Sequence, residues 1–179
     1  MKHFISRRNF LKAAGVTAAA SAMAAAVPQA SAGFLTGKDA AVTILYTNDV
    51  HTYIDNKSPK LTYAAIAAMK QGYVDEGKPV LLVDAGDHIQ GTAYGSMDDG
   101  ATIIELMNEA GYDIATLGNH EFDYGMARAK AIIKEADFPY VSCNWVDLRT
   151  GLRVLPAVKL FPAGGKWIAF VGITTPESF

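Results

Sequence analysis

Polar residues that could bind a metal ion or move a proton follow three apolar stretches of this 179-residue chain. In each case the polar residues come directly after a run that reads as a buried strand. The three groups are Asn48, Asp49 and His51; Asp84, Asp87 and His88; and Asn119, His120, Glu121 and Asp123. If the strands are parallel, their carboxyl ends meet at one edge of a sheet, where open α/β folds bind ligands. We therefore expect these groups to converge.

A convergent set of this composition predicts a cation site. Carboxylates that lie close together repel one another, and a bound cation removes that conflict. Carboxylate, imidazole and amide donors without a thiolate suit Mn, Fe, Zn or Mg better than a closed structural zinc site. His120 and Asp123 stand three residues apart. A carboxylate beside a histidine holds the imidazole in one tautomer and makes it more basic, as acid–base catalysis requires.

The elements that would position these residues alternate along the chain. We expect strands over 41–49, 78–87 and 113–121, with helices over 58–77, 99–112 and 124–137 between and after them. Ser58 is the expected N-cap of the first helix with Pro59 at its first position, and Gly111 is the expected stop of the second. Such alternation predicts βαβ units and a parallel sheet. Three closely spaced strands are expected to follow, in 139–145, 152–162 and 165–175.

The first 32 residues have the features of an export signal. Lys2, Arg7, Arg8 and Lys12 precede an Ala-rich apolar run, and Ala30 and Ala32 occupy the small-residue positions of a cleavage site. The stretch "SRRNFLK" resembles the twin-arginine signal. We predict a signal peptide over 1–32 cleaved after Ala32, a linker over 33–40 and a domain over 41–179. The expected partner is the twin-arginine export machinery, and the expected location is periplasmic or extracellular.

Charge and cysteine content exclude some classes of function. The chain has 16 Lys+Arg and 18 Asp+Glu. The leader takes four basic residues and no acid, which leaves 12 against 18 and a net charge of −6 on the mature part. An acidic surface is a poor partner for a nucleic-acid polymer. No stable membrane span is expected in the mature chain, and the lone Cys143 permits no internal disulfide.

Three sequence blocks carry a family resemblance. "NDVH", "DAGDHIQGT" and "LGNHEFDYG" resemble the first signature blocks of the calcineurin-like metallophosphoesterases, within the branch of 5′-nucleotidases, UDP-sugar hydrolases and 2′,3′-cyclic phosphodiesterases. The likeness begins near Val42, and "VGITTPES" near the end resembles a further block of that branch. The resemblance implies a four-layer α/β/β/α sandwich, of which this chain would supply roughly the N-terminal half.

The resemblance also implies roles for individual residues. Asp49 and His51 would ligate the first of two divalent metal ions, Asp87 would bridge both ions, and Asn119 would ligate the second. His120 would stay off the metals and face the phosphate as transition-state stabiliser or general acid. Asp123 would orient that imidazole. The implied substrate is a small phosphate ester or nucleotide.

Two departures from the family pattern affect these expectations. Thr52 stands where many relatives have glycine, which would alter the loop without removing a ligand. The family's further histidine ligands come from loops far downstream, and no histidine follows His120 here. We therefore expect the parent protein to be an enzyme, and residues 33–179 alone to be weakly active or inactive.

Several polar residues also have a structural interpretation. Asp84 is expected to hydrogen-bond loop amides, and Glu121 to support the ligands or cap a helix. For His88 an exposed loop position and a supporting position are equally compatible with the pattern. Asn119 could instead favour a left-handed turn. The tyrosines near the predicted loops (Tyr46, Tyr53, Tyr94 and Tyr112) are expected in the core or at the rim.

Three functions are compatible with the sequence. The first is an exported dimetal phosphohydrolase that acts on nucleotides. The second is a thiosulfohydrolase of sulfur oxidation, which resembles the same branch. The third is an exported, non-catalytic protein that binds a metal or ligand. A binder needs no oriented imidazole, so the presence of both His120 and Asp123 argues against the third.

Overall fold

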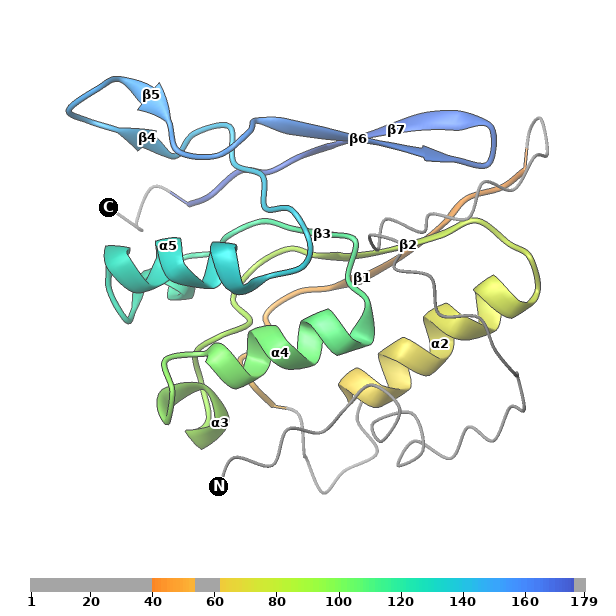
Figure 1. The fold of residues 1–179 in the computed structure, drawn as a ribbon, viewed down its shortest axis with the longest axis horizontal. Helices are drawn as coiled ribbons and strands as arrows, with labels where there is room; N and C mark the ends of the chain where they lie inside the picture. Colours follow the sequence, from red (N-terminus) through yellow and green to blue (C-terminus); the bar gives the residue numbers. More distant parts are fainter. Residues whose placement is uncertain (1–39, 54–61, 176–179) are drawn as a thin grey trace, which may run out of the picture.

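The computed structural model describes residues 40–53 and 62–175 of the chain, and Figure 1 shows its fold. The elements are β1 (Thr43–Thr47), α2 (Tyr63–Asp75), β2 (Val80–Asp84), α3 (Ala93–Ser96), α4 (Ala101–Ala110), β3 (Ile114–Ala115), the 3-10 helix η1 (His120–Phe122), α5 (Met126–Glu135), β4 (Val146–Asp147), β5 (Leu152–Arg153), β6 (Val158–Ala163) and β7 (Lys166–Val171).

The central layer is the predicted parallel sheet. Its strands run in the order β1-β2-β3, and both pairings are parallel. Thr47, at the end of β1, pairs with Asp84, and Asp84 pairs with Ala115 at the end of β3. The three carboxyl ends therefore adjoin, which confirms the expectation that the loops after them share one edge of the sheet.

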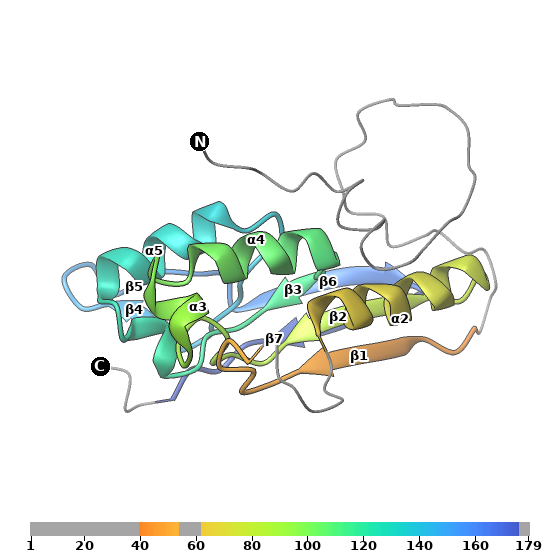
Figure 2. The same ribbon diagram turned by 90° about the horizontal axis from the view of Figure 1, so that it is seen from below.

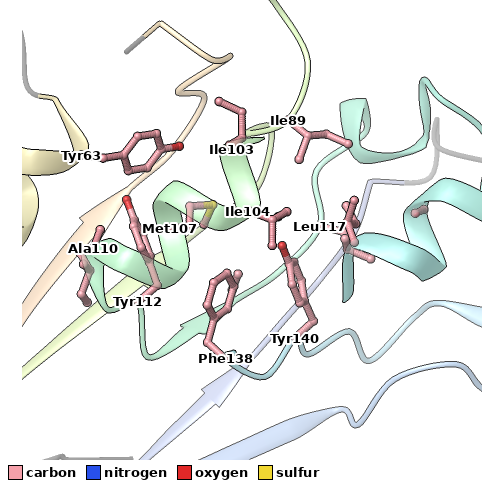
Figure 3. Close-up of a cluster of buried hydrophobic side chains, with 14 of the residues drawn as sticks. Tyr63, Ile89, Ile103, Ile104, Met107, Ala110, Tyr112, Leu117, Phe138 and Tyr140 are labelled. Carbon is pink, nitrogen blue, oxygen red and sulfur yellow. The ribbon is translucent and has the colours of Figure 1, made fainter. Parts of the chain in front are cut away.

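Helices α2, α4 and α5 cover one face of this sheet (Figures 1 and 2). The largest core cluster lies between them and the sheet, and Figure 3 shows its central side chains. Ile103, Ile104 and Met107 of α4 are fully buried there because they recur on one side of the helix. Gly111 ends α4 in the left-handed conformation (φ 77°), with its N–H donating to carbonyls of the last turn, as predicted for the helix stop.

The β6–β7 hairpin covers the opposite face of the sheet (Figure 1). A second, smaller cluster joins the two layers: Leu81 of β2, Ile114 of β3 and Phe161 of β6 are buried together with Val141 and Ala163. Helices, parallel sheet and hairpin thus form three successive layers of α/β class.

Several element boundaries differ from the sequence prediction. Thr62 caps α2 by accepting the Ala65 N–H (3.2 Å), so the helix begins later than predicted, and Ser58 and Pro59 lie outside the described residues. The strand predicted over 139–145 is wrong, since only a single bridge forms there, from Tyr140 to Ala115. The strand predicted over 152–162 is two strands, β5 and β6, which belong to different hairpins. Helix α3 was not predicted.

The predicted signal peptide and all of the predicted linker except Ala40 lie outside the described residues. Among the residues that the structure does describe, no helix is both long and apolar enough to cross a membrane.

Candidate metal centre

The loops that follow β1, β2 and β3 are joined by backbone hydrogen bonds. We call residues 48–53 the first loop, 85–92 the second and 116–125 the third. Asp49 N–H donates to the Gly86 carbonyl (3.1 Å) and His51 N–H to the Asp87 carbonyl (2.9 Å), which ties the first loop to the second. His120 N–H donates to Asp87 Oδ1 (2.8 Å), which ties the third loop to the second.

Two glycines make this close approach possible. A Cβ on Gly86 would collide with the backbone of Gly118, and a Cβ on Gly118 would collide with the Asp87 side chain. Gly86 also has φ 106°, a conformation that side chains disfavour. The absence of a side chain at these two positions lets the backbone turn tightly beside the site.

The loops bring together a group of side chains that could hold a metal ion. One potential ligand atom each from His51, Asp87 and His120 lies within 4.8 Å of the others. The two imidazole rings meet edge to face, with centroids 4.9 Å apart and an interplanar angle of 71°. This group therefore includes His120, for which the family resemblance implied a role off the metals.

A backbone carbonyl orients the imidazole of His51. His51 Nδ1 lies 3.1 Å from the Gln90 carbonyl oxygen. Because a carbonyl can only accept, Nδ1 carries the proton, and Nε2 is left with its lone pair. His51 Nε2 lies 3.9 Å from Asp49 Oδ1. Histidines that bind metal ions commonly donate their other ring N–H to a backbone carbonyl in this way.

Two carboxylates meet at the same place. Asp49 is largely exposed and its carboxylate accepts a hydrogen bond from Asn48 Nδ2. Burial raises the pKa of Asp87, and the nearby Glu121 and Asp49 carboxylates raise that pKa further, while the bond from the His120 N–H opposes them. Close carboxylates that disfavour each other's charge are stabilised when a cation binds between them.

Asp123 lies directly against His120. The distance from His120 Nδ1 to Asp123 Oδ2 is 2.7 Å, so Nδ1 donates and Nε2 is the atom left for the site. The hydrogen bond that His120 donates to Asp123 raises the pKa of His120 most, partial burial opposes the rise, and the charges of Asp123 and Asp87 add to it. The imidazole is about one-third exposed, so a small ligand can reach it.

Asn119 precedes His120 at the start of η1 and is partly buried. Its φ of −79° and ψ of −31° are right-handed helical values. The alternative that this residue favours a left-handed turn is therefore wrong.

A buried polar cluster lies beneath the loops. Asp84 Oδ1 accepts the Gly86 N–H (2.8 Å), which confirms the structural role predicted for Asp84. His88 is fully buried between Asp84 Oδ1 (2.8 Å) and the Tyr140 hydroxyl (2.9 Å), so an exposed loop position for His88 is wrong. Burial alone would lower the pKa of His88, but the Glu121 and Asp84 carboxylates reverse this and raise it to about 9. Glu121 is also fully buried.

One contact between loops was not foreseen. Thr52 is fully buried, and its hydroxyl lies 2.7 Å from that of Thr92 and accepts the Thr92 N–H (2.6 Å). The only sequence signal was the departure from glycine at this position. Of the tyrosines considered, Tyr112 lies in the core, whereas Tyr46, Tyr53 and Tyr94 are exposed.

The site therefore offers two oriented imidazoles, two carboxylates and a neighbouring amide, with no thiolate. This donor set fits a divalent cation of the Mn, Fe, Zn or Mg kind. An imidazole backed by a carboxylate stands beside it and can hold or transfer a proton.

Comparison with known proteins agrees with this geometry. The family model "Calcineurin-like phosphoesterase" matches residues 42–176, and the model of the twin-arginine translocation signal matches residues 5–27. The second match confirms the predicted export signal, which directs a protein across the cytoplasmic membrane.

Similar proteins are 5′-nucleotidases. The snake venom 5′-nucleotidase of Gloydius brevicauda is 35% identical over 153 residues, covering 76% of this chain and 26% of that protein. The human 5′-nucleotidase is 35% identical over 155 residues, covering 76% of this chain and 27% of that protein. A crystal structure of a 5′-nucleotidase precursor from Thermus thermophilus superposes with a TM-score of 0.67 at 30% identity, covering 76% of this chain and 29% of that one. The chain thus spans about a quarter of the length of the curated relatives it matches.

Proposed function

This chain belongs to the calcineurin-like phosphoesterase family. From that premise we propose that it is part of an exported, metal-dependent hydrolase that releases phosphate from nucleotides. The observation that carries the proposal is the meeting of His51, Asp87 and His120 within 4.8 Å at the carboxyl edge of the sheet. The similar proteins named 5′-nucleotidases support a nucleotide as the substrate.

We propose Asp49, His51, Asp87 and Asn119 as the metal ligands supplied by these loops. Asp87 lies centrally, since its loop is bonded to both of the others, and it would bridge two ions. Two divalent ions bound there would activate a water molecule and polarise the phosphoryl oxygens.

We propose His120 and Asp123 as the catalytic pair. With Nδ1 donating to Asp123, Nε2 is the nitrogen left for the site, and the raised pKa of His120 favours the protonated imidazole. A protonated Nε2 can hydrogen-bond a phosphoryl oxygen and donate its proton to the departing nucleoside oxygen.

Phosphate release from AMP by the full-length protein tests this function. We expect release that requires added Mn²⁺ or Zn²⁺, stops with EDTA, and falls to background in Asp87→Ala. The matched control is Glu105→Gln, which changes an exposed carboxylate on α4 and should leave the rate unchanged.

The same preparation separates the alternatives. Hydrolysis of a thiosulfonate but not of AMP would replace the nucleotide substrate with the thiosulfohydrolase reaction. Metal binding without turnover of either compound would support a non-catalytic binding protein and contradict the proposal.

A further inference from the structure

We propose that Glu121 is a positioning residue for the metal centre, whose carboxylate clamps the loop that carries Asp87 to the loop that carries Asn119 and His120. The inference rests on the proposed function in that it takes Asp87 and Asn119 as ligands. It concerns a residue that contributes no ligand atom itself.

Both carboxylate oxygens of Glu121 are occupied by backbone N–H groups. Oε2 accepts from Gly118 (2.6 Å) in the third loop and from Asp87 (2.8 Å) in the second. Oε1 accepts from His88 (2.8 Å) and, at 3.5 Å, from Ile89. The carboxylate is fully buried, so it serves these amides rather than solvent. Its place one residue after His120 therefore does not make it a ligand.

The clamp acts on a residue whose backbone has a disfavoured conformation. Asp87 has φ 58°, a left-handed value that residues with a side chain disfavour. Its N–H is held by Glu121, and its Oδ1 in turn accepts the His120 N–H (2.8 Å). Each loop thus supplies a carboxylate that binds the backbone of the other, which fixes the direction of the Asp87 side chain.

A carboxylate fits this place better than an amide. A glutamine would present one acceptor oxygen and would turn its NH₂ group toward backbone N–H donors. His88 Nδ1 lies 3.5 Å from Glu121 Oε1, so a neighbouring imidazole offsets part of the cost of burying the carboxylate. Loss of these hydrogen bonds should therefore displace the Asp87 side chain as well as lower the stability of the fold.

Mn²⁺ binding to the full chain, measured from the electron paramagnetic resonance signal of free Mn²⁺, tests the clamp. We expect Glu121→Gln to weaken Mn²⁺ binding by at least ~10-fold, the size of effect usual for partners of metal ligands. In EDTA, the amides of Gly118, Asp87 and His88 should also exchange hydrogen faster than in the wild type.

Tyr140→Phe is the matched control. It removes the hydroxyl that bonds His88 Nε2 in the same buried cluster, and Tyr140 lies outside the second and third loops. Urea unfolding in EDTA should show a loss of stability in both variants, whereas Mn²⁺ affinity in Tyr140→Phe should change less than twofold. If Glu121→Gln does not fold, Glu121→Asp, which keeps the charge but withdraws it by one methylene, should show the weaker binding.

Unchanged Mn²⁺ affinity in the folded glutamate variant would overturn the proposal. So would an equal loss of affinity in Tyr140→Phe, since it would assign the effect to general destabilisation. A wild-type chain that binds no Mn²⁺ would overturn both this inference and the metal centre. Mn²⁺ binding together with an absence of AMP hydrolysis by the full-length protein would contradict only the proposed function.

Discussion

At the scale of single residues, the contact between His120 and Asp123 has a consequence that can be measured without metal or substrate. The hydrogen bond that His120 donates to the Asp123 carboxylate is the main reason why the pKa of His120 is raised. In Asp123→Asn we expect that pKa to fall toward its ordinary value, because an amide carries no charge. Nuclear magnetic resonance titration of the imidazole in EDTA measures it.

AMP hydrolysis by Asp123→Asn should fall by about 100-fold if the pair transfers a proton, the lower end of what general acid catalysis contributes. Asp75→Asn, at the exposed end of α2, is the control for the loss of one carboxylate. An unchanged His120 titration would mean that the contact does not set the basicity of the imidazole.

The buried His88 predicts a pH dependence of stability. Its pKa is about 9 in the folded chain, above an unfolded value near ~6.5. A raised folded pKa means that its contribution is fully present below the unfolded pKa and is lost as pH rises through the folded pKa. The free energy of unfolding, measured by urea in EDTA, should therefore fall between about pH 6.5 and pH 9, by at most about 1.4 kcal/mol per pH unit from this group.

His88→Gln should be less stable at pH 6 and should show a smaller decline toward pH 9. If wild type and variant decline in parallel, His88 is not charged within the buried cluster.

The roles of residues were predictable from the sequence to different degrees. Asp84 could be assigned a structural role because an acid at a strand end commonly bonds the following amides. His88 could not be assigned, because its neighbour Tyr140 lies 52 positions away in sequence. The full burial of Glu121 was equally out of reach, since it depends on how the second and third loops meet.

At the scale of elements, the first loop is held in a conformation that its residues disfavour. Asp49, His51 and Thr52 all have positive φ, of 53°, 47° and 58°. Thr52 is the least suited because it is β-branched, and a glycine at this position would avoid that strain. The hydroxyl contact between Thr52 and Thr92, the N-cap of α3, compensates for it.

Two substitutions at Thr52 separate strain from hydrogen bonding. Thr52→Val keeps the shape and strain but leaves the Thr92 N–H without its acceptor, at a cost of about 1–3 kcal/mol. Thr52→Gly loses the same bond but relieves about 1–2 kcal/mol of strain, so its loss should be smaller. Urea unfolding measures both.

Thr150→Val in the exposed β4–β5 turn is the control, expected within about 0.5 kcal/mol of wild type. Equal losses in Thr52→Val and Thr52→Gly would show that left-handed strain at this residue is negligible.

Helices and strands could be predicted from the sequence where the local pattern was strong. Gly111 ended α4 as predicted, and the alternation of strands and helices identified the parallel sheet. The first predicted helix boundary was wrong because Thr62, and not the predicted Ser58, is the residue that caps α2. The apolar run over 152–162 gave no sign of its break because the division depends on two different antiparallel partners, β4 and β7.

At the scale of the whole molecule, the β6–β7 hairpin has two unlike faces. Phe161 and its partner Ile168 face the parallel sheet, whereas Leu160 and its partner Ala169 face away from it. Leu160 is 53% exposed and Phe161 only 9%. Substitutions at these adjacent residues of β6 therefore test the two opposite faces of the hairpin.

Replacing each of the two by alanine tests whether the layers have this arrangement in solution. Phe161→Ala opens a cavity between hairpin and sheet and should cost about 3 kcal/mol in urea unfolding. Leu160→Ala removes an exposed side chain and should change stability by no more than about 0.5 kcal/mol. Equal and large losses would mean that the outward face is also packed in solution, whereas equal and small losses would mean that the hairpin does not pack on the parallel sheet. Strands β2 and β3 lead into the second and third loops, so a loose hairpin would leave Leu81 and Ile114 uncovered on the strands that position the candidate metal centre.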